Sequence, residues 1–284
     1  MRSQTGTESF GMTGLVKKLT ALSLIINIIS EGLKKNIQHK VISVFTLSYI
    51  NSLVITSNTK MLSGTDFVKK IKEGNKELFE ASRSNVRRFF ESKPSDEYLV
   101  EHFRGRMVNE AQNMYAIAGQ VASADPSTDV RDLELLSKQA MDEAKHFRMV
   151  KEVIEHITGE ELDVAEAFAA EADAPQAKGA SLLEKYEASN DEAALAAYQL
   201  VAEGRAEAVW NEMADCVEDR FISSRYASIA KDEGFHSNLG GRSLSKLVEG
   251  KEELQTRVLA LVEKMREDLL EISNQNTATP LALV

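Results

Sequence analysis

Two copies of one short pattern, D-E-x-x-H, constrain this chain more than any other feature of its sequence. The first copy covers residues 142–146 (DEAKH) and the second covers residues 232–236 (DEGFH). Residues i and i+3 lie about 60° apart around a helix and one turn along it, so the Glu and the His of one copy can reach the same point. Each copy therefore predicts a helix that turns a carboxylate and an imidazole to one side.

The residues around each copy form an apolar stripe with a polar middle. The first stripe consists of Leu135, Gln139, Asp142, Glu143, His146, Met149, Val150 and Val153, and the second of Ile229, Asp232, Glu233, His236, Leu239 and Gly240. Burying these carboxylates without partners would cost several kcal/mol each, and a bound metal ion removes that cost. A single helical Glu-x-x-His is more often a solvated pair. Two copies in otherwise apolar stripes favour a metal site.

A two-metal helical bundle needs one further carboxylate from each of two other helices. Glu110 is the upstream candidate, because it lies 33 residues before Glu143 on a face that also carries methionines. Downstream, Glu203 lies 30 residues before Glu233 and is preferred, while Glu207, one turn further on, remains the alternative. We expect Arg205 and Glu212 to face solvent. The predicted ligands, which are also the predicted catalytic residues, are Glu110, Glu143, His146, Glu203, Glu233 and His236.

The chain past residue 60 has a helical pattern throughout. It contains only 4 prolines and is rich in Ala, Leu, Glu and Lys, a balance that favours helix over sheet. We expect helices at about 66–92, 97–122, 129–157, 191–217, 222–248 and 252–272. A less regular connection over 160–190 can carry the chain from one end of a bundle to the other. The predicted fold is all-α, a four-helix bundle with additional flanking helices.

The first 60 residues differ in composition from the rest. They contain one alanine, Ala21, and two acids, Glu8 and Glu31. Their two apolar stretches, 19–29 and 41–55, are short and interrupted, whereas a membrane span needs about 20 apolar residues. The composition favours two alternatives: the segment is poorly ordered, or it is non-native and translation begins at Met61. The predicted organisation is an N-terminal extension (1–60), the helical bundle (61–274) and a flexible tail (275–284).

Charge and cysteine content restrict the partners. The net charge of −10 argues against binding to nucleic acid or to an anionic membrane. A basic stretch at residues 83–106 is explained by a solvated helix face. The single cysteine, Cys216, excludes an internal disulfide and fits a reducing cytoplasm. We therefore expect a cytoplasmic protein with no nucleic-acid partner and no membrane partner.

The order of these acidic and histidine residues, over about residues 97–245, resembles the ferritin-like di-iron carboxylate superfamily. The Asp that leads each copy resembles the hydroxylase subunits of bacterial non-haem di-iron monooxygenases and their relatives. In those families this Asp accepts a hydrogen bond from a metal-bound histidine, and the resemblance gives that role to Asp142 and Asp232. The monooxygenases usually carry Arg just before the His, where this chain has Lys145 and Phe235.

The resemblance implies a ferritin-like bundle that holds two Fe ions, although the same ligands suit an Fe/Mn pair. It further implies an oxygenase or oxidase that uses O2 to oxidise a small organic substrate. The sequence has no flavin or iron–sulfur motif, so the electrons would come from a separate reductase or ferredoxin; we also expect a homodimer. The alternative is a ferroxidase or a rubrerythrin-like protein that handles iron or peroxide. The apolar residues expected to line a substrate pocket are Met107, Met114, Phe147, Trp210 and Phe235, with the 160–190 connection closing one end.

Overall fold

The computed structural model describes residues 61–172, 182, 185–186 and 191–278. Within these residues every regular element is an α-helix, which confirms the predicted all-α bundle with flanking helices. In chain order the helices are α3 (Gly64–Gly74), α4 (Lys76–Glu91), α5 (Asp96–Ser123), α6 (Val130–Thr158), α7 (Val164–Ala172), α9 (Glu192–Cys216), α10 (Arg220–Val248) and α11 (Glu252–Ala278). The predicted extension at 1–60 and residues 279–284 lie outside the described part, so the predicted domain boundaries stay predictions.

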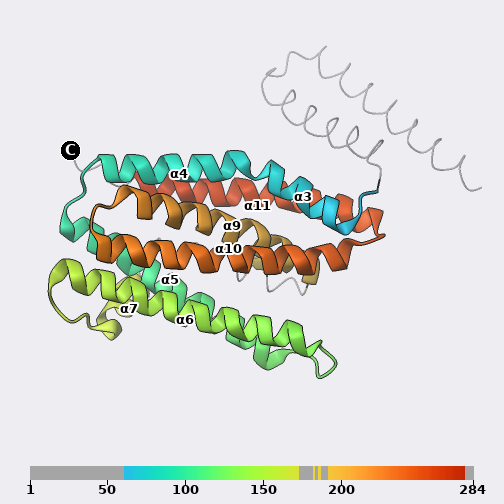
Figure 1. The fold of residues 1–284 in the computed structure, drawn as a ribbon, viewed down its shortest axis with the longest axis horizontal. Coiled ribbons are helices and arrows are strands. Elements are labelled where there is room, and N and C mark those ends of the chain that lie inside the picture. The colour runs from blue at the N-terminus through green and yellow to red at the C-terminus, as the bar shows by residue number, and fades with distance from the viewer. Residues whose placement is uncertain (1–60, 173–181, 183–184, 187–190, 279–284) are drawn as a thin grey trace, which may run out of the picture. The chain divides into compact units, whose positions relative to one another are not determined.

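Two helix pairs form the centre of the bundle. Helix α5 packs along α6, and α9 packs along α10, while contacts between α6 and α10 join the two pairs (Figure 1). Helices α4 and α11 pack against α9, and α3 packs against α10. These three, together with α7, which packs against α5, are the flanking helices. The four central helices are those that carry the predicted ligands.

Side-chain caps explain why the central helices begin and end within two residues of the predicted positions. The hydroxyl of Ser95 and the carboxylates of Asp129, Asp191 and Asp219 accept hydrogen bonds from the first free amides of α5, α6, α9 and α10. Gly159, at φ 72°, ends α6 in the left-handed conformation that suits glycine. Local sequence signals therefore set these boundaries.

The predicted continuous helix over 66–92 is wrong, because the chain breaks at Asn75 into α3 and α4. Asn75 is only 1% exposed. Arg266, from α11, donates one hydrogen bond to Asn75 Oδ1 (2.9 Å) and another to the carbonyl oxygen of Ile71 (3.0 Å). The break thus coincides with a contact made by a residue far along the chain, which no local pattern can reveal.

Helix α10 approaches α9 more closely than ordinary side chains would allow. A Cβ atom at Gly240 would lie 2.6 Å from the backbone nitrogen of Leu200 and 2.9 Å from the carbonyl oxygen of Ala196. The facing side of α9 is rich in buried alanine, including Ala193 and Ala197. Small residues on both helices therefore set the α9–α10 distance, and with it the separation of the acids that the two helices carry.

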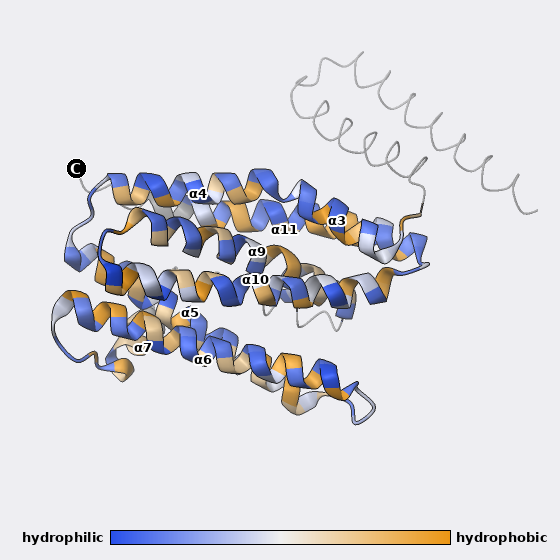
Figure 2. Cartoon of the chain, in the orientation of Figure 1, coloured by the Kyte–Doolittle hydropathy of each residue, from blue (hydrophilic) through white to orange (hydrophobic). Residues whose placement is uncertain are grey.

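A cluster of apolar side chains fills the end of the bundle where α5 begins and α6 ends, and is called the apolar end below. Its largest buried members are Phe103, Met107, Ile154, Trp210, Met213, Tyr226 and Ile229. Figure 2 shows that apolar and polar residues alternate around each of the central helices. In the part of the chain that the structure describes, no helix is long and apolar enough to cross a membrane.

Candidate metal centre

Each of the four central helices contributes an acidic residue from its middle turns to one buried cluster. Potential ligand atoms fall into two groups, and within each group they lie within 4.8 Å of one another. The first group is Glu110, Glu143, His146 and Glu233, and the second is Glu143, Glu203, Glu233 and His236. The structure therefore brings all six predicted site residues together.

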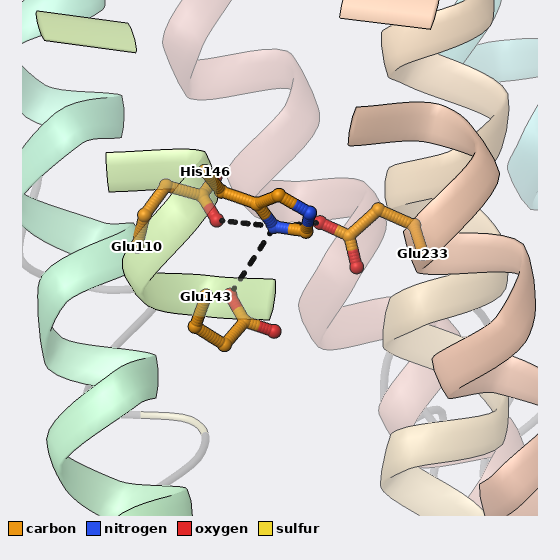
Figure 3. A group of neighbouring side chains, drawn as sticks. All are labelled: Glu110, Glu143, His146 and Glu233. Carbon is orange, nitrogen blue, oxygen red and sulfur yellow. Dashed lines mark ion pairs between the residues drawn. The ribbon is translucent and has the colours of Figure 1, made fainter. Parts of the chain in front are cut away.

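The first group surrounds a point that a metal ion could occupy (Figure 3). His146 Nδ1 lies 3.5 Å from Glu110 Oε2, 3.6 Å from Glu143 Oε2 and 3.5 Å from Glu233 Oε1. Nitrogen and oxygen ligands about 2.0–2.2 Å from a common ion are themselves about 3.0–3.5 Å apart. The three distances from His146 Nδ1 are close to that spacing, and all four ligand atoms lie within 4.8 Å of one another.

Glu143 and Glu233 each belong to both groups because their two oxygens point to different histidines. Glu143 turns Oε2 toward His146, while its Oε1 lies 3.2 Å from His236 Nδ1. Glu233 turns Oε1 toward His146, while its Oε2 lies 3.3 Å from His236 Nδ1. These two carboxylates could bridge a pair of ions, with Glu110 and Glu203 as the outer ligand of each.

The cluster is too polar for its burial unless something binds it. Glu143, His146 and His236 are each 0% exposed. Glu110 Oε2, both oxygens of Glu143 and His146 Nδ1 have no hydrogen-bond partner. Buried polar atoms are normally paired, and each exception costs about 1–3 kcal/mol. Four carboxylates carry a formal charge of −4, which two divalent cations would balance, so the residues present fit a two-metal centre.

Without a metal, bound protons neutralise part of the negative charge of the four carboxylates. Burial and the neighbouring carboxylates Glu143 and Glu233 raise the pKa of Glu110 to about 8. Burial likewise raises the pKa of Glu203 well above its usual value. Although burial opposes ionisation of Glu143, its contacts with His146 and His236 lower its pKa to about 2. A cation that enters the cluster therefore displaces protons from the site.

The two aspartates hold the histidines in a crossed arrangement. Asp232 Oδ2 lies 3.4 Å from His146 Nε2, and Asp142 Oδ2 lies 3.2 Å from His236 Nε2. Each Asp thus contacts the histidine of the other motif, which leaves both Nδ1 atoms turned to the cluster. Lys145 donates to Asp232 at 2.5 Å, and Lys138 donates to Asp142. The contacts hold the imidazoles in place, which is the role that the resemblance assigns to these aspartates.

Helix α9 places Glu203, and not Glu207, among the possible ligands. Glu207 instead lies against Gly234, where an added Cβ would come within 2.8 Å of its carboxylate oxygen. The glycine in the second motif therefore makes room for an acid outside the two groups. Glu212 is 14% exposed and pairs with Arg87 at 3.0 Å, so the expected solvent-facing position is wrong for Glu212.

Two glutamines outside the predicted ligand set extend the site on one side. Gln139 is 1% exposed and donates to Glu203 Oε1 at 3.2 Å, and Gln199 donates to the side-chain oxygen of Gln139. Both lie one turn before a predicted ligand, Glu143 in α6 and Glu203 in α9. This i−4 spacing places each glutamine on the same helix face as a ligand, so the sequence already contained a signal for them. Gln139 also stands as a polar residue within the first apolar stripe.

A cavity of about 120 Å³ opens beside Glu203, between α5, α6, α9 and α11. Its polar lining is mostly amide: Asn109, Asn113, Gln120, Gln139 and Gln199. Among the residues that the structure describes, neither the five predicted apolar residues nor the 160–190 connection borders it. Met107 and Trp210 belong to the apolar end instead. Arg205 also lines this cavity, so the expectation that it faces solvent is wrong.

Comparison with protein-family models, with curated proteins and with solved structures finds no match for this chain.

Proposed function

We propose that this chain is a non-haem di-iron enzyme of the ferritin-like type that uses O2 to oxidise a small organic substrate. The observation that carries the proposal is the sharing of Glu143 and Glu233 between two adjacent groups of ligands. Shared carboxylates would hold two ions side by side, whereas a single structural ion would need only one group. Hard oxygen donors with two imidazoles suit iron, and equally an Fe/Mn pair.

When bound, the metal pair would supply the electrons that reduce O2. The surrounding residues support that chemistry in stated ways. Asp142 and Asp232 hold the Nε2 sides of the histidines, Gln139 orients Glu203, and the apolar end excludes water from one side of the centre. Electrons would come from a separate reductase or ferredoxin, and we expect the enzyme to act as a homodimer.

The competing function is iron handling, as in ferroxidases or rubrerythrin-like proteins. An iron entry route needs carboxylates that attract cations, but Glu203 is the one acid among the described residues that line the cavity. Neutral amides are better suited to hydrogen bonds with an organic molecule. The composition of the cavity lining therefore favours an oxygenase or oxidase over iron mineralisation.

The test is metal analysis of protein expressed with ample iron, followed by O2 consumption after reduction. We expect about two metal ions per chain, as the two groups of ligands require. Well-folded protein that contains no metal would contradict the proposal that the cluster binds metal ions. Continued loading of ferric ions, far beyond two per chain and with no oxidised organic product, would favour the ferroxidase alternative.

A further inference from the structure

The cavity beside Glu203 is lined by a cation that has no counterion among the described residues. Arg205 lines it from α9, and its Nε donates to the hydroxyl of Ser273 at 3.0 Å. Arg205 and Ser273 also line a second, smaller cavity of about 30 Å³, so the arginine lies between the two. No carboxylate in the described part of the chain lies within 4.0 Å of its guanidinium nitrogens. A guanidinium stays protonated in proteins, and burying a charge without a partner is costly. An anionic ligand would provide the missing partner.

Two amides of α5 also line this cavity. Asn109 and Asn113 lie one turn apart on α5 and line the cavity. Neither side chain makes a hydrogen bond within the described residues. Each amide offers two donors and one acceptor. The wall therefore suits a ligand with polar groups, such as the second carboxylate oxygen, a hydroxyl or an amine.

The size and the remaining lining restrict the ligand further. A cavity of about 150 Å³ holds benzene, which has six heavy atoms, so 120 Å³ suits a molecule of about that size. Ile117, Leu195, Leu269 and Ile272 provide apolar contacts for a short hydrocarbon portion. A planar carboxylate matches the fork of a guanidinium and fits this space.

We infer that this cavity binds a small aliphatic carboxylic acid, with its carboxylate on Arg205 and its polar groups on Asn109 and Asn113. The inference rests on the proposed function, because it names the substrate class of the same centre. Since Glu203 borders the cavity, the far end of the ligand would lie beside the His236 side of the cluster.

The test compares butyrate with butyramide, which has the same size and no charge, by calorimetric titration of metal-loaded and metal-free full-length protein. We expect butyrate to bind more tightly than butyramide in both forms. Arg205→Met should weaken butyrate about 10- to 100-fold, as expected for a lost charge-assisted hydrogen bond, and change butyramide little. Asn109→Leu and Asn113→Leu should change butyrate little, because its one polar group is the carboxylate, and should weaken 4-hydroxybutyrate, whose hydroxyl would reach these amides. Arg83→Met, a partly exposed arginine on α4 paired with Glu80, is the matched control.

Metal content and circular dichroism, measured on each variant, keep the two proposals separate. Equal affinity for butyrate and butyramide overturns the inference. Butyrate binding that needs metal but not Arg205 also overturns it, because the carboxylate would then bind the metal ion directly. If such a protein still holds two metals and consumes O2, the proposed function stands. If the protein lacks metal yet binds butyrate through Arg205, the ligand class stands and the proposed function falls.

Discussion

The two halves of the cluster have the same kinds of ligand but different surroundings. On the His146 side, the adjoining turns of α5, α6 and α10 lead into the apolar end, and Glu110 Oε2 has no hydrogen-bond partner. On the His236 side, Glu203 accepts a hydrogen bond from Gln139 and borders a cavity lined with amides. The repeated motif therefore gives the two halves similar ligands. The residues one turn away differ, and they decide whether a half faces apolar side chains or a cavity that a ligand can enter. We expect the His146 half to retain its ion and the His236 half to meet the substrate.

The largest effect should come from the residues that the two halves share. Glu143→Ala removes oxygens that face both histidines, so we expect metal content to fall from two ions per chain to well below one. Elemental analysis of folded protein measures it. Glu207→Gln is the control, since Glu207 lies outside both ligand groups, and it should keep both ions. Two retained ions in Glu143→Ala would show that Glu143 does not bridge.

The crossed aspartates offer a way to separate the halves. Asp232→Asn should weaken the ion beside His146, and Asp142→Asn the ion beside His236, by about 10- to 100-fold each. Double variants identify which ion is affected: Asp232→Asn should be non-additive with Glu110→Gln and additive with Glu203→Gln. The measurement is competition with a chelator of known affinity. The reverse pattern would mean that each Asp acts on the histidine of its own motif.

A smaller effect should come from Gln139, which belongs to the cavity side alone. Gln139→Leu removes one hydrogen bond to Glu203 and should weaken one ion by about 2- to 10-fold. The other ion should keep its affinity. Stepwise metal titration resolves the two events. Equal weakening of both ions would show that the two halves are not independent.

The smallest effect concerns acid stability near the apolar end, where α5 carries His102. Burial, assisted by repulsion from Arg106, lowers the pKa of His102 to about 3. Between that value and the unfolded pKa near 6.5, the unfolded chain binds a proton that the folded chain does not. The free energy of unfolding should therefore fall by about 1 kcal/mol from pH 7 to pH 5.5, and His102→Gln should reduce that slope. Denaturant titrations at the two pH values, with His156→Gln as a partly exposed control, test this.

The helix boundaries and the six clustered residues could be predicted because they depend on local chemistry. Capping side chains and the i, i+3 spacing of Glu143 and His146 are visible in a single window of sequence. The break at Asn75 could not be predicted, since it coincides with a contact from Arg266 in the last helix. The amide lining and the position of Arg205 depend on how α5, α9 and α11 meet, which helix periodicity alone does not reveal.

The crossed contacts between the aspartates and the histidines have a consequence for how such a centre can arise. A helical hairpin that carried only one D-E-x-x-H motif would lack the acceptor that its own histidine uses here, because that acceptor stands on the other hairpin. Each hairpin completes its counterpart. An ancestor with one motif would therefore have needed to associate with a second copy of itself before either histidine was oriented. Gene duplication and fusion would then place in one chain the two hairpins that had associated as separate chains.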